Sequence, residues 1–169
     1  MMNEIKKLFL DFDGPILDNR QKYAALHRHL LRDAGGQALG ADEYWSLKRT
    51  RVPETEILQR CGVHESQWDD YLRRRQAGIE NEEVLTLDEV GVPTWLVERS
   101  RTCAIYLVTL RKRRATLLAQ LDRLELLHLF DAVLSEDAND GSASVKVRLM
   151  APYVNSAKHA VLVGDTEAD

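Results

Sequence analysis

Two aspartates that lie two residues apart follow a short apolar run near the start of the chain. Leu8-Phe9-Leu10 has the length and composition of a buried strand, and Asp11-Phe12-Asp13-Gly14 comes directly after it. Ligands of open α/β sheets bind just beyond the carboxyl ends of the strands, so both carboxylates are expected in one crevice. Like charges this close repel each other unless a cation lies between them. Taken alone, the segment also fits a strand followed by an acidic turn, because Asp-Gly is a common turn sequence.

Three later segments place polar side chains at or near the ends of strand-like runs. Val161-Leu162-Val163 is followed by Gly164-Asp165-Thr166-Glu167-Ala168-Asp169, and Ile105-Tyr106-Leu107-Val108 is followed by Thr109. Lys146 stands between these two runs, at the start of a helix-like stretch. The order Asp-x-Asp, Thr, Lys and Gly-Asp-x-x-x-Asp resembles the four motifs of the haloacid dehalogenase superfamily. The resemblance extends over essentially the whole chain, and its two outer motifs are the specific ones.

The order of expected strands and helices favours an α/β fold with a parallel sheet. Strand-like segments cover residues 6–10, 103–109, 132–134 and 160–163. The last three are separated by helical patterns, among them a stripe of leucines between residues 117 and 129, as in right-handed βαβ units. We therefore predict a three-layer, Rossmann-like parallel sheet.

The long stretch after the first strand contains helical patterns and no convincing strand. Apolar residues recur at helical spacing over residues 23–31 and 68–79. We predict a helical insertion from 16 to 88 and an α/β core formed by 1–15 and 89–169. In the superfamily that the chain resembles, an insertion at this place forms a mobile cap over the active site. The alternative, that these helices belong to the core, stays open, because periodicity does not show which surface a helix covers.

The resemblance implies a role for each of the motif residues. Asp11 is the nucleophile that takes up a phosphoryl group, and Asp13 is the general acid for the leaving alcohol and then the base for water. Thr109 donates a hydrogen bond to the phosphoryl oxygens, and Lys146 neutralises charge on the nucleophile and the phosphate. Asp13 also favours phosphoryl transfer over dehalogenation, which needs no acid at this place.

A divalent cation is implied as well, because a bare carboxylate would repel an anionic phosphate ester. Mg²⁺ takes a few carboxylates together with water and substrate phosphate. The implied ligands are the side chains of Asp11 and Asp165 and the backbone carbonyl of Asp13. Asp169 is expected to hold Lys146 or a metal-bound water in place.

Two places depart from the usual pattern of the family. Lys146 is followed by valine where relatives often have proline, and Arg148 is either a substitute cation or, more simply, an exposed surface arginine. Thr109 is followed by Leu110 and Arg111, where small or polar residues are commoner in relatives. Arg111 is therefore expected either to narrow the phosphate pocket or to bring a guanidinium group to the substrate.

Composition narrows the expected partners and compartment. No apolar stretch approaches the roughly 20 residues that span a bilayer, and residues 1–7 lack the apolar region of a secretion signal. Cys61 and Cys103 do not suggest a disulfide framework, so the cytoplasm is the expected compartment. The net charge of −4 gives no reason to expect nucleic-acid binding. The glycine-rich motifs of P-loop and dinucleotide-binding proteins are absent from the sequence.

These features together predict a Mg²⁺-dependent phosphatase that acts on a small phosphorylated metabolite. A phosphomutase with the same motifs and a non-catalytic, phosphate-sensing or scaffold protein are the alternatives. The chain stops at Asp169, where relatives continue through further elements, so the strand at 160–163 would form an unprotected sheet edge. We expect that the chain is a truncated form. The alternatives are a partner that covers this edge and a poorly organised site. The sequence names neither the substrate nor the oligomeric state.

Overall fold

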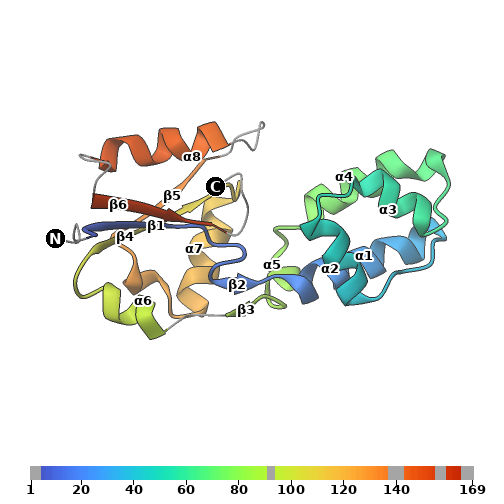
Figure 1. Ribbon diagram of the computed structural model, residues 1–169. Helices are drawn as coiled ribbons and strands as arrows, with labels where there is room; N and C mark the ends of the chain where they lie inside the picture. The colour runs from blue at the N-terminus through green and yellow to red at the C-terminus, as the bar shows by residue number, and fades with distance from the viewer. Residues whose placement is uncertain (1–4, 91–93, 137–142, 155–158, 165–169) are drawn as a thin grey trace. The chain divides into compact units, whose positions relative to one another are not determined.

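The computed structural model describes residues 5–90, 94–136, 143–154 and 159–164, and its contacts divide the chain into two compact units. The first unit is formed by Met1–Asp18 with Glu89–Asp169, and the second by Asn19–Asp88. The sheet of the first unit has the strand order β5-β4-β1-β6, and every neighbouring pair in it is parallel (Figure 1). Its strands are β1 (Lys7–Leu10), β4 (Ala104–Thr109), β5 (Ala132–Ser135) and β6 (Ala160–Val163). The predicted parallel α/β fold is confirmed.

Helices cover both faces of this sheet. The other elements of the first unit are β2 (Leu17–Asp18), β3 (Glu89–Val90), α6 (Thr94–Arg99), α7 (Arg114–Arg123), α8 (Ala143–Met150) and the 3-10 turns Leu127–Leu129 and Ala151–Tyr153. Successive side chains of a strand point to opposite faces, so Leu8 and Leu10 pack with leucines of α6 and α7, whereas Phe9 packs with apolar residues of α8. Figure 1 shows α8 on one side of the sheet and α6 and α7 on the other. The three-layer arrangement predicted from the sequence is therefore correct.

Two short strands lie where the sequence analysis expects none. Leu17 of β2 pairs with Val90 of β3, and Asp18 pairs with Glu89, in antiparallel orientation. Ile16 and Leu17 are fully buried in the core of the first unit, so the contact boundary lies after Asp18, later than the expected boundary at residue 15. The expectation of no strand is wrong here, because a strand of two residues has no periodicity to recognise and depends on a partner distant in the sequence.

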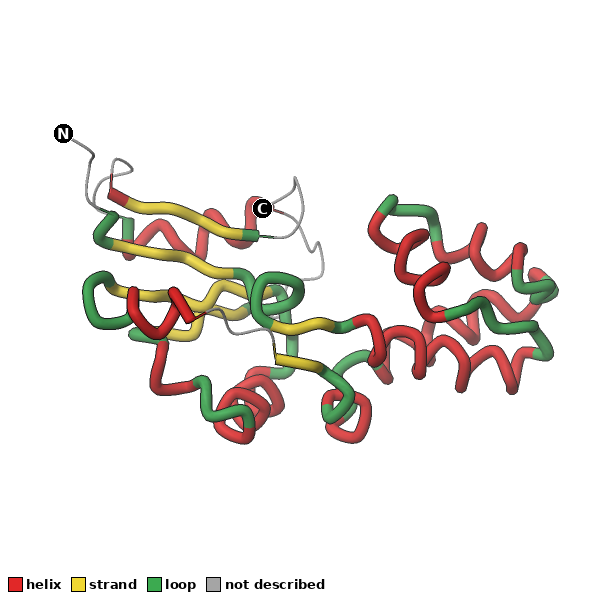
Figure 2. Tube along the Cα trace, turned by 60° about the horizontal axis from the view of Figure 1, so that its bottom comes forward, coloured by secondary structure: helices red, strands yellow, loops and turns green. Residues whose placement is uncertain are grey.

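The second unit is built of helices and loops (Figure 2). Its elements are α1 (Arg20–Ala34), α2 (Ala41–Arg49), α3 (Glu54–Arg60), the 3-10 turn Glu65–Gln67, α4 (Trp68–Gly78) and α5 (Glu82–Leu85). Leu30 and Leu31 of α1, Ile57 of α3 and Tyr71 of α4 belong to one buried cluster, which gives the unit its own core. Gly62, with a φ of +74°, lets the chain turn sharply just after α3. The role of this unit as a cap stays a prediction.

A buried carboxylate lies inside the helical unit. Glu54 Oε1 accepts a hydrogen bond from the Tyr44 hydroxyl at 2.9 Å, and Glu54 Oε2 accepts one from Lys48 Nζ at 2.8 Å. Arg75 Nε lies 3.5 Å from the same Oε2 atom. Burial acts to raise the pKa of Glu54, but Arg75 and Lys48 outweigh it, so this pKa lies below its ordinary value. Glu54 therefore stays charged and holds α2, α3 and α4 together.

His27 is buried beside this network. Its Nδ1 atom lies 2.6 Å from the Tyr71 hydroxyl, its Nε2 atom lies 3.7 Å from Cys61 Sγ, and its ring stacks on Tyr44 with the centroids 4.0 Å apart. Burial lowers the pKa of His27 from 6.5 to about 4, although the charge of Glu54 opposes this change. Burial also raises the pKa of Tyr71, so the phenol stays protonated and shares a hydrogen bond with Nδ1 of a neutral His27.

We expect the stability of the chain to fall as the pH decreases from about 6.5 to about 4. The unfolded chain binds a proton at His27 below pH 6.5, whereas the folded chain binds it only below about pH 4. The free energy of unfolding should therefore decrease by roughly 3 kcal/mol across this window because of His27. Urea unfolding of the full chain at several pH values between about 7 and about 4.5 measures the decrease.

The variant His27→Gln should lose most of this pH dependence, even where it is less stable at neutral pH. His29 is exposed on the same helix, so His29→Gln is the matched control and should keep the dependence of the wild-type chain. Equal pH dependence in the His27→Gln and wild-type chains would contradict the prediction.

Candidate active site

The parallel register aligns the carboxyl ends of the central strands. Leu10 of β1 lies opposite Leu107 of β4 and Val163 of β6. Thr109 is the last residue of β4, and Asp11 follows β1 directly, so both lie at the same edge of the sheet. The Asp11 N–H donates to the Val163 carbonyl at 2.9 Å, which extends the pairing of β1 with β6 by one residue. This edge is where ligands bind in open α/β sheets.

The loop after β1 turns back at once toward β2. Gly14 has a φ of +104°, which residues with a side chain rarely adopt. The Gly14 N–H donates to the Leu17 carbonyl at 3.0 Å, and the Leu17 N–H donates to the Phe12 carbonyl at 3.1 Å. Phe12 is completely buried and anchors the loop to the core of this unit. The turn therefore keeps Asp13 close to the end of the strand that carries Asp11.

Asp11 is held by an ion pair with Lys146, which α8 supplies. Lys146 Nζ donates to Asp11 Oδ2 at 2.7 Å, and the two side chains are 6% and 13% exposed. The Phe12 N–H donates to the other carboxylate oxygen, Oδ1, at 2.7 Å. Burial raises the pKa of Asp11 above its ordinary value, although the hydrogen bond and the charge of Lys146 oppose this change. The carboxylate is thus oriented at both oxygens and only partly stabilised in its charged form.

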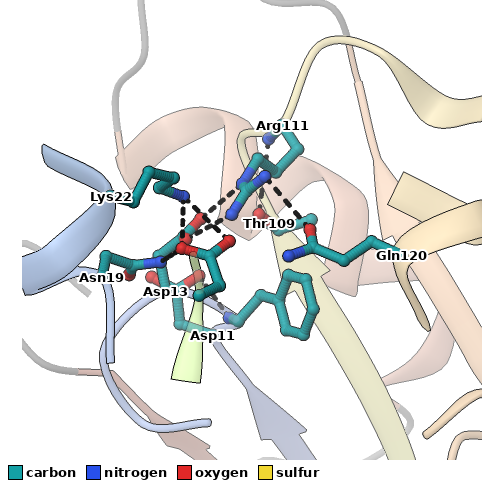
Figure 3. A network of polar contacts seen from close by, with 9 residues as sticks. Asp11, Asp13, Asn19, Lys22, Thr109, Arg111 and Gln120 are labelled. Atoms are coloured by element: carbon teal, nitrogen blue, oxygen red, sulfur yellow. Dashed lines mark hydrogen bonds and ion pairs between the residues drawn. The ribbon is translucent and has the colours of Figure 1, made fainter. Parts of the chain in front are cut away.

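Asp13 is held by Arg111 in a two-point contact. Arg111 Nε donates to Asp13 Oδ2 at 2.6 Å, and Arg111 Nη2 donates to Asp13 Oδ1 at 2.5 Å. On its other side the guanidinium donates from Nη1 to Gln120 Oε1 at 3.4 Å, and its Cζ atom lies 5.6 Å from the centre of the Phe12 ring. Figure 3 shows Arg111 with Asp13 and Gln120 around it. The Asp13 side chain is 30% exposed and that of Arg111 only 7%.

The Thr109 hydroxyl lies beside this pair. Its Oγ1 atom accepts a hydrogen bond from the Arg111 N–H at 3.3 Å, and the residue is 1% exposed. Because the hydroxyl oxygen is the acceptor in this bond, the hydroxyl group can still donate its own hydrogen bond to another acceptor. Thr109 can therefore donate a hydrogen bond to an anion at the edge of the sheet.

Four of the predicted site residues lie at this edge: Asp11, Asp13, Thr109 and Lys146. The predicted metal ligand Asp165 and its neighbour in the motif, Asp169, lie outside the described residues. Arg148 is not part of the site, because it is exposed and pairs with Glu136 at 2.8 Å. Of the two interpretations of Arg148, the surface arginine is therefore the correct one.

The sequence does not reveal which cation pairs with Asp13. From the sequence, Arg111 is expected to narrow the pocket or to face the substrate, whereas in the structure its guanidinium group donates to Asp13 and Gln120. One signal was available, since Gln120 is a polar residue within the apolar stripe of α7. Gln120 is 1% exposed, and a buried amide in such a stripe requires a polar partner nearby.

The chemistry of the donor atoms at this edge fits Mg²⁺. The Asp11 carboxylate and the backbone carbonyl of Asp13 offer the hard oxygen atoms that Mg²⁺ prefers, and this ion usually keeps several waters instead of a complete protein cage. Within the described residues, no group of three or more His, Cys, Asp or Glu side chains could hold a metal. Within the described part of the site, Asp11 and Asp13 are the residues that would hold Mg²⁺, and the predicted ligand Asp165 lies outside the described residues.

Most of the chain matches one protein family. Residues 8–169 match the model of the haloacid dehalogenase-like hydrolases, and no curated protein matches the chain. A haloacid dehalogenase-like hydrolase from Streptococcus pneumoniae is 19% identical, with 98% of this chain and 78% of that chain covered and a TM-score of 0.75. A predicted phosphatase from Clostridium acetobutylicum is 15% identical, with 98% and 78% covered and a TM-score of 0.70. YfnB from Bacillus subtilis, solved with bound magnesium, is 18% identical, with 98% and 80% covered and a TM-score of 0.64. These structures share the fold of this chain.

Replacing Lys146 with methionine should lower the free energy of unfolding by roughly 3 kcal/mol, because Asp11 would be left buried and without its cation. The double variant Asp11→Asn/Lys146→Met should recover most of this loss, since neither charge remains. Urea unfolding without divalent cations measures both.

The matched control for this prediction is Arg148→Met on the same helix. Its ion pair with Glu136 is exposed, so the variant should change the free energy of unfolding by less than about 1 kcal/mol. Equal losses of unfolding free energy in the Lys146 and Arg148 variants would show that the buried Asp11–Lys146 pair contributes no more to stability than an exposed ion pair.

Proposed function

The chain belongs to the haloacid dehalogenase-like hydrolase family, and we propose that it is a Mg²⁺-dependent phosphatase that acts on a small phosphorylated metabolite. One observation carries the proposal: two carboxylates, a buried hydroxyl and a buried ammonium group meet at the carboxyl ends of β1 and β4. These groups match the needs of phosphoryl transfer, namely a nucleophile, an acid and base, a hydrogen-bond donor and a cation.

In the first step, an oxygen of the Asp11 carboxylate attacks the phosphorus atom and the bond from phosphorus to the leaving oxygen breaks. Protonated Asp13 gives its proton to that oxygen, so the alcohol leaves in neutral form. In the second step, water attacks the phosphorus of the aspartyl-phosphate, Asp13 takes a proton from the water, and the bond to Asp11 breaks. The two-point contact with Arg111 suits the carboxylate form of Asp13, which is the form that the second step needs.

The charges at the site support an anionic substrate. The carboxylates of Asp11 and Asp13 are balanced by the cations of Lys146 and Arg111. When bound, Mg²⁺ would make the site net positive before the substrate binds, even with the carboxylate of Asp165 added, and a net positive site attracts an anionic phosphate. Lys146 donates a hydrogen bond directly to Asp11, so it can neutralise charge on the nucleophile and on an incoming phosphoryl group.

The cytoplasm is the compartment that we propose for this activity. Cys61 and Cys103 are both buried free thiols, which suits a reducing compartment. Among the helices of the described part of the chain, none has both the length and the apolar character needed to cross a membrane.

Phosphate release from a panel of phosphorylated metabolites, with Mg²⁺ and with EDTA, tests the proposal. We expect Mg²⁺-dependent release that favours one class of ester. The rate of Mg²⁺-dependent phosphate release should be at least ~1000-fold lower in Asp11→Asn than in the wild-type chain, because no nucleophile remains. The variant should keep its fold. Asp122 is an exposed aspartate on α7, so Asp122→Asn is the matched control and should keep full activity.

Retained Mg²⁺-dependent release in the Asp11→Asn chain would refute the proposed mechanism. Transfer of the phosphoryl group to a sugar hydroxyl instead of to water would identify a phosphomutase, and product analysis separates the two. Mg²⁺ binding without turnover of any ester would favour a non-catalytic, phosphate-sensing protein.

A further inference from the structure

Arg111 is a buried cation of the described site, and it lies against Asp13. Its side chain is 7% exposed, and it lies two residues after Thr109 at the start of the segment that leads into α7. A buried guanidinium is costly unless its charge is paired and its N–H groups find acceptors. The groups that pair with the Arg111 guanidinium therefore indicate the role of this residue.

The guanidinium is fixed from several directions. Both oxygens of Asp13 accept from it, at 2.6 and 2.5 Å, and the amide oxygen of Gln120 accepts from a third nitrogen at 3.4 Å. The ring of Phe12 lies against it, with 5.6 Å between Cζ and the ring centre. The backbone N–H of Arg111 is bonded to Thr109 Oγ1 at 3.3 Å. Arg111 is thus held rigidly and presents a fork of matching geometry to one carboxylate.

This geometry sets the plane of the Asp13 carboxylate. A single hydrogen bond would leave the group free to rotate about its terminal bond, whereas two parallel bonds fix the positions of both oxygens. The Asp13 side chain is 30% exposed, so it is not fully enclosed by its ion pair with Arg111. A proton transferred through Asp13 therefore starts from, or arrives at, a defined place.

We infer that Arg111 is a positioning residue that holds the Asp13 carboxyl group in place for proton transfer to the leaving group. The inference rests on the proposed function and deepens it, since it assigns to Arg111 a task that acts through Asp13. Arg111 itself does not bind the phosphoryl group. After Asp13 has given its proton to the leaving oxygen, the carboxylate that remains is the group that the fork of Arg111 fits.

The dependence on the leaving group distinguishes this role from phosphate binding. A good leaving group departs as an anion and gains little from an acid, whereas a poor one needs the proton. Loss of a phosphate-binding cation lowers the rate for both kinds of ester, because both carry the same phosphoryl group. Misplacing the acid lowers the rate mainly for the poor leaving group.

The experiment compares kcat/KM for p-nitrophenyl phosphate and for phenyl phosphate, whose leaving group is poorer, in the presence of Mg²⁺. The variants are Arg111→Met, which removes the fork, and Arg111→Lys, which keeps the charge without the two-point geometry. Arg114 lies in the same basic run and bonds to the Val133 carbonyl and the Ser135 hydroxyl, so Arg114→Met is the matched control. The ratio of the two kcat/KM values is taken within each variant. Partial misfolding lowers both values by the same factor and therefore leaves this ratio unchanged.

For Arg111→Met we expect kcat/KM to fall by ~100-fold with phenyl phosphate and by less than ~5-fold with p-nitrophenyl phosphate. Arg111→Lys should restore part of the loss with phenyl phosphate, and Arg114→Met should leave the ratio unchanged. In an Asp13→Asn background, adding Arg111→Met should change kcat/KM by no more than ~3-fold, because the group that Arg111 positions is already gone.

Three outcomes would overturn the inference. Equal losses with both esters would make Arg111 a phosphate-binding residue, and an undiminished effect in the Asp13→Asn background would show that it acts independently of Asp13. A ratio that changes as much in Arg114→Met would assign the effect to the charge of the segment. If the wild-type chain turns over neither these two esters nor any phosphorylated metabolite of the panel, the proposed function fails and the inference fails with it, whereas an active wild-type chain with any of the three outcomes removes only the role of Arg111.

Discussion

The pairing of β1 on both of its sides is the constraint on which the candidate site depends. β1 is hydrogen-bonded in parallel to β4 and to β6, so its carboxyl end lies between the carboxyl ends of these two strands. The backbone groups of the strand are satisfied by the sheet, and the side chains that follow it must find partners on neighbouring elements. Thr109 at the end of β4 and Lys146 on α8 are such neighbours. The site is thus assembled from segments that are far apart in the sequence.

Each carboxylate of the first motif has a cation of its own. Lys146 holds Asp11 through one hydrogen bond, whereas Arg111 holds Asp13 through two. The difference in chemistry suits the two proposed tasks. An ammonium group is a point charge on a flexible stem and can follow a phosphoryl group during its transfer, but a planar guanidinium fixes the orientation of the carboxylate that it binds. Two neighbouring charges that would otherwise repel each other are in this way stabilised separately.

The elements that could be predicted are those with a local signature. The four sheet strands begin and end within one residue of their expected bounds, because buried parallel strands are short apolar runs. The leucine stripe after Thr109 likewise marks α7, although the helix ends at Arg123 and a 3-10 turn carries Leu127 and Leu129. Strands β2 and β3 could not be predicted, since two residues form no pattern and their pairing joins segments that precede and follow the helical unit in the sequence.

The sequence by itself determined which chemical groups this protein can bring to its site. Two aspartates directly after a buried strand, a threonine at the end of another and a lysine on a later helix are local facts, and they are sufficient to indicate the family. Only the tertiary structure decided that Arg111 turns to Asp13, a residue 98 positions away. The direction of a guanidinium group depends on which partners surround it. Gln120 lies only nine residues along the chain, but Asp13 and Phe12 become neighbours of Arg111 only in the folded chain, and no local sequence pattern encodes contacts between segments so far apart.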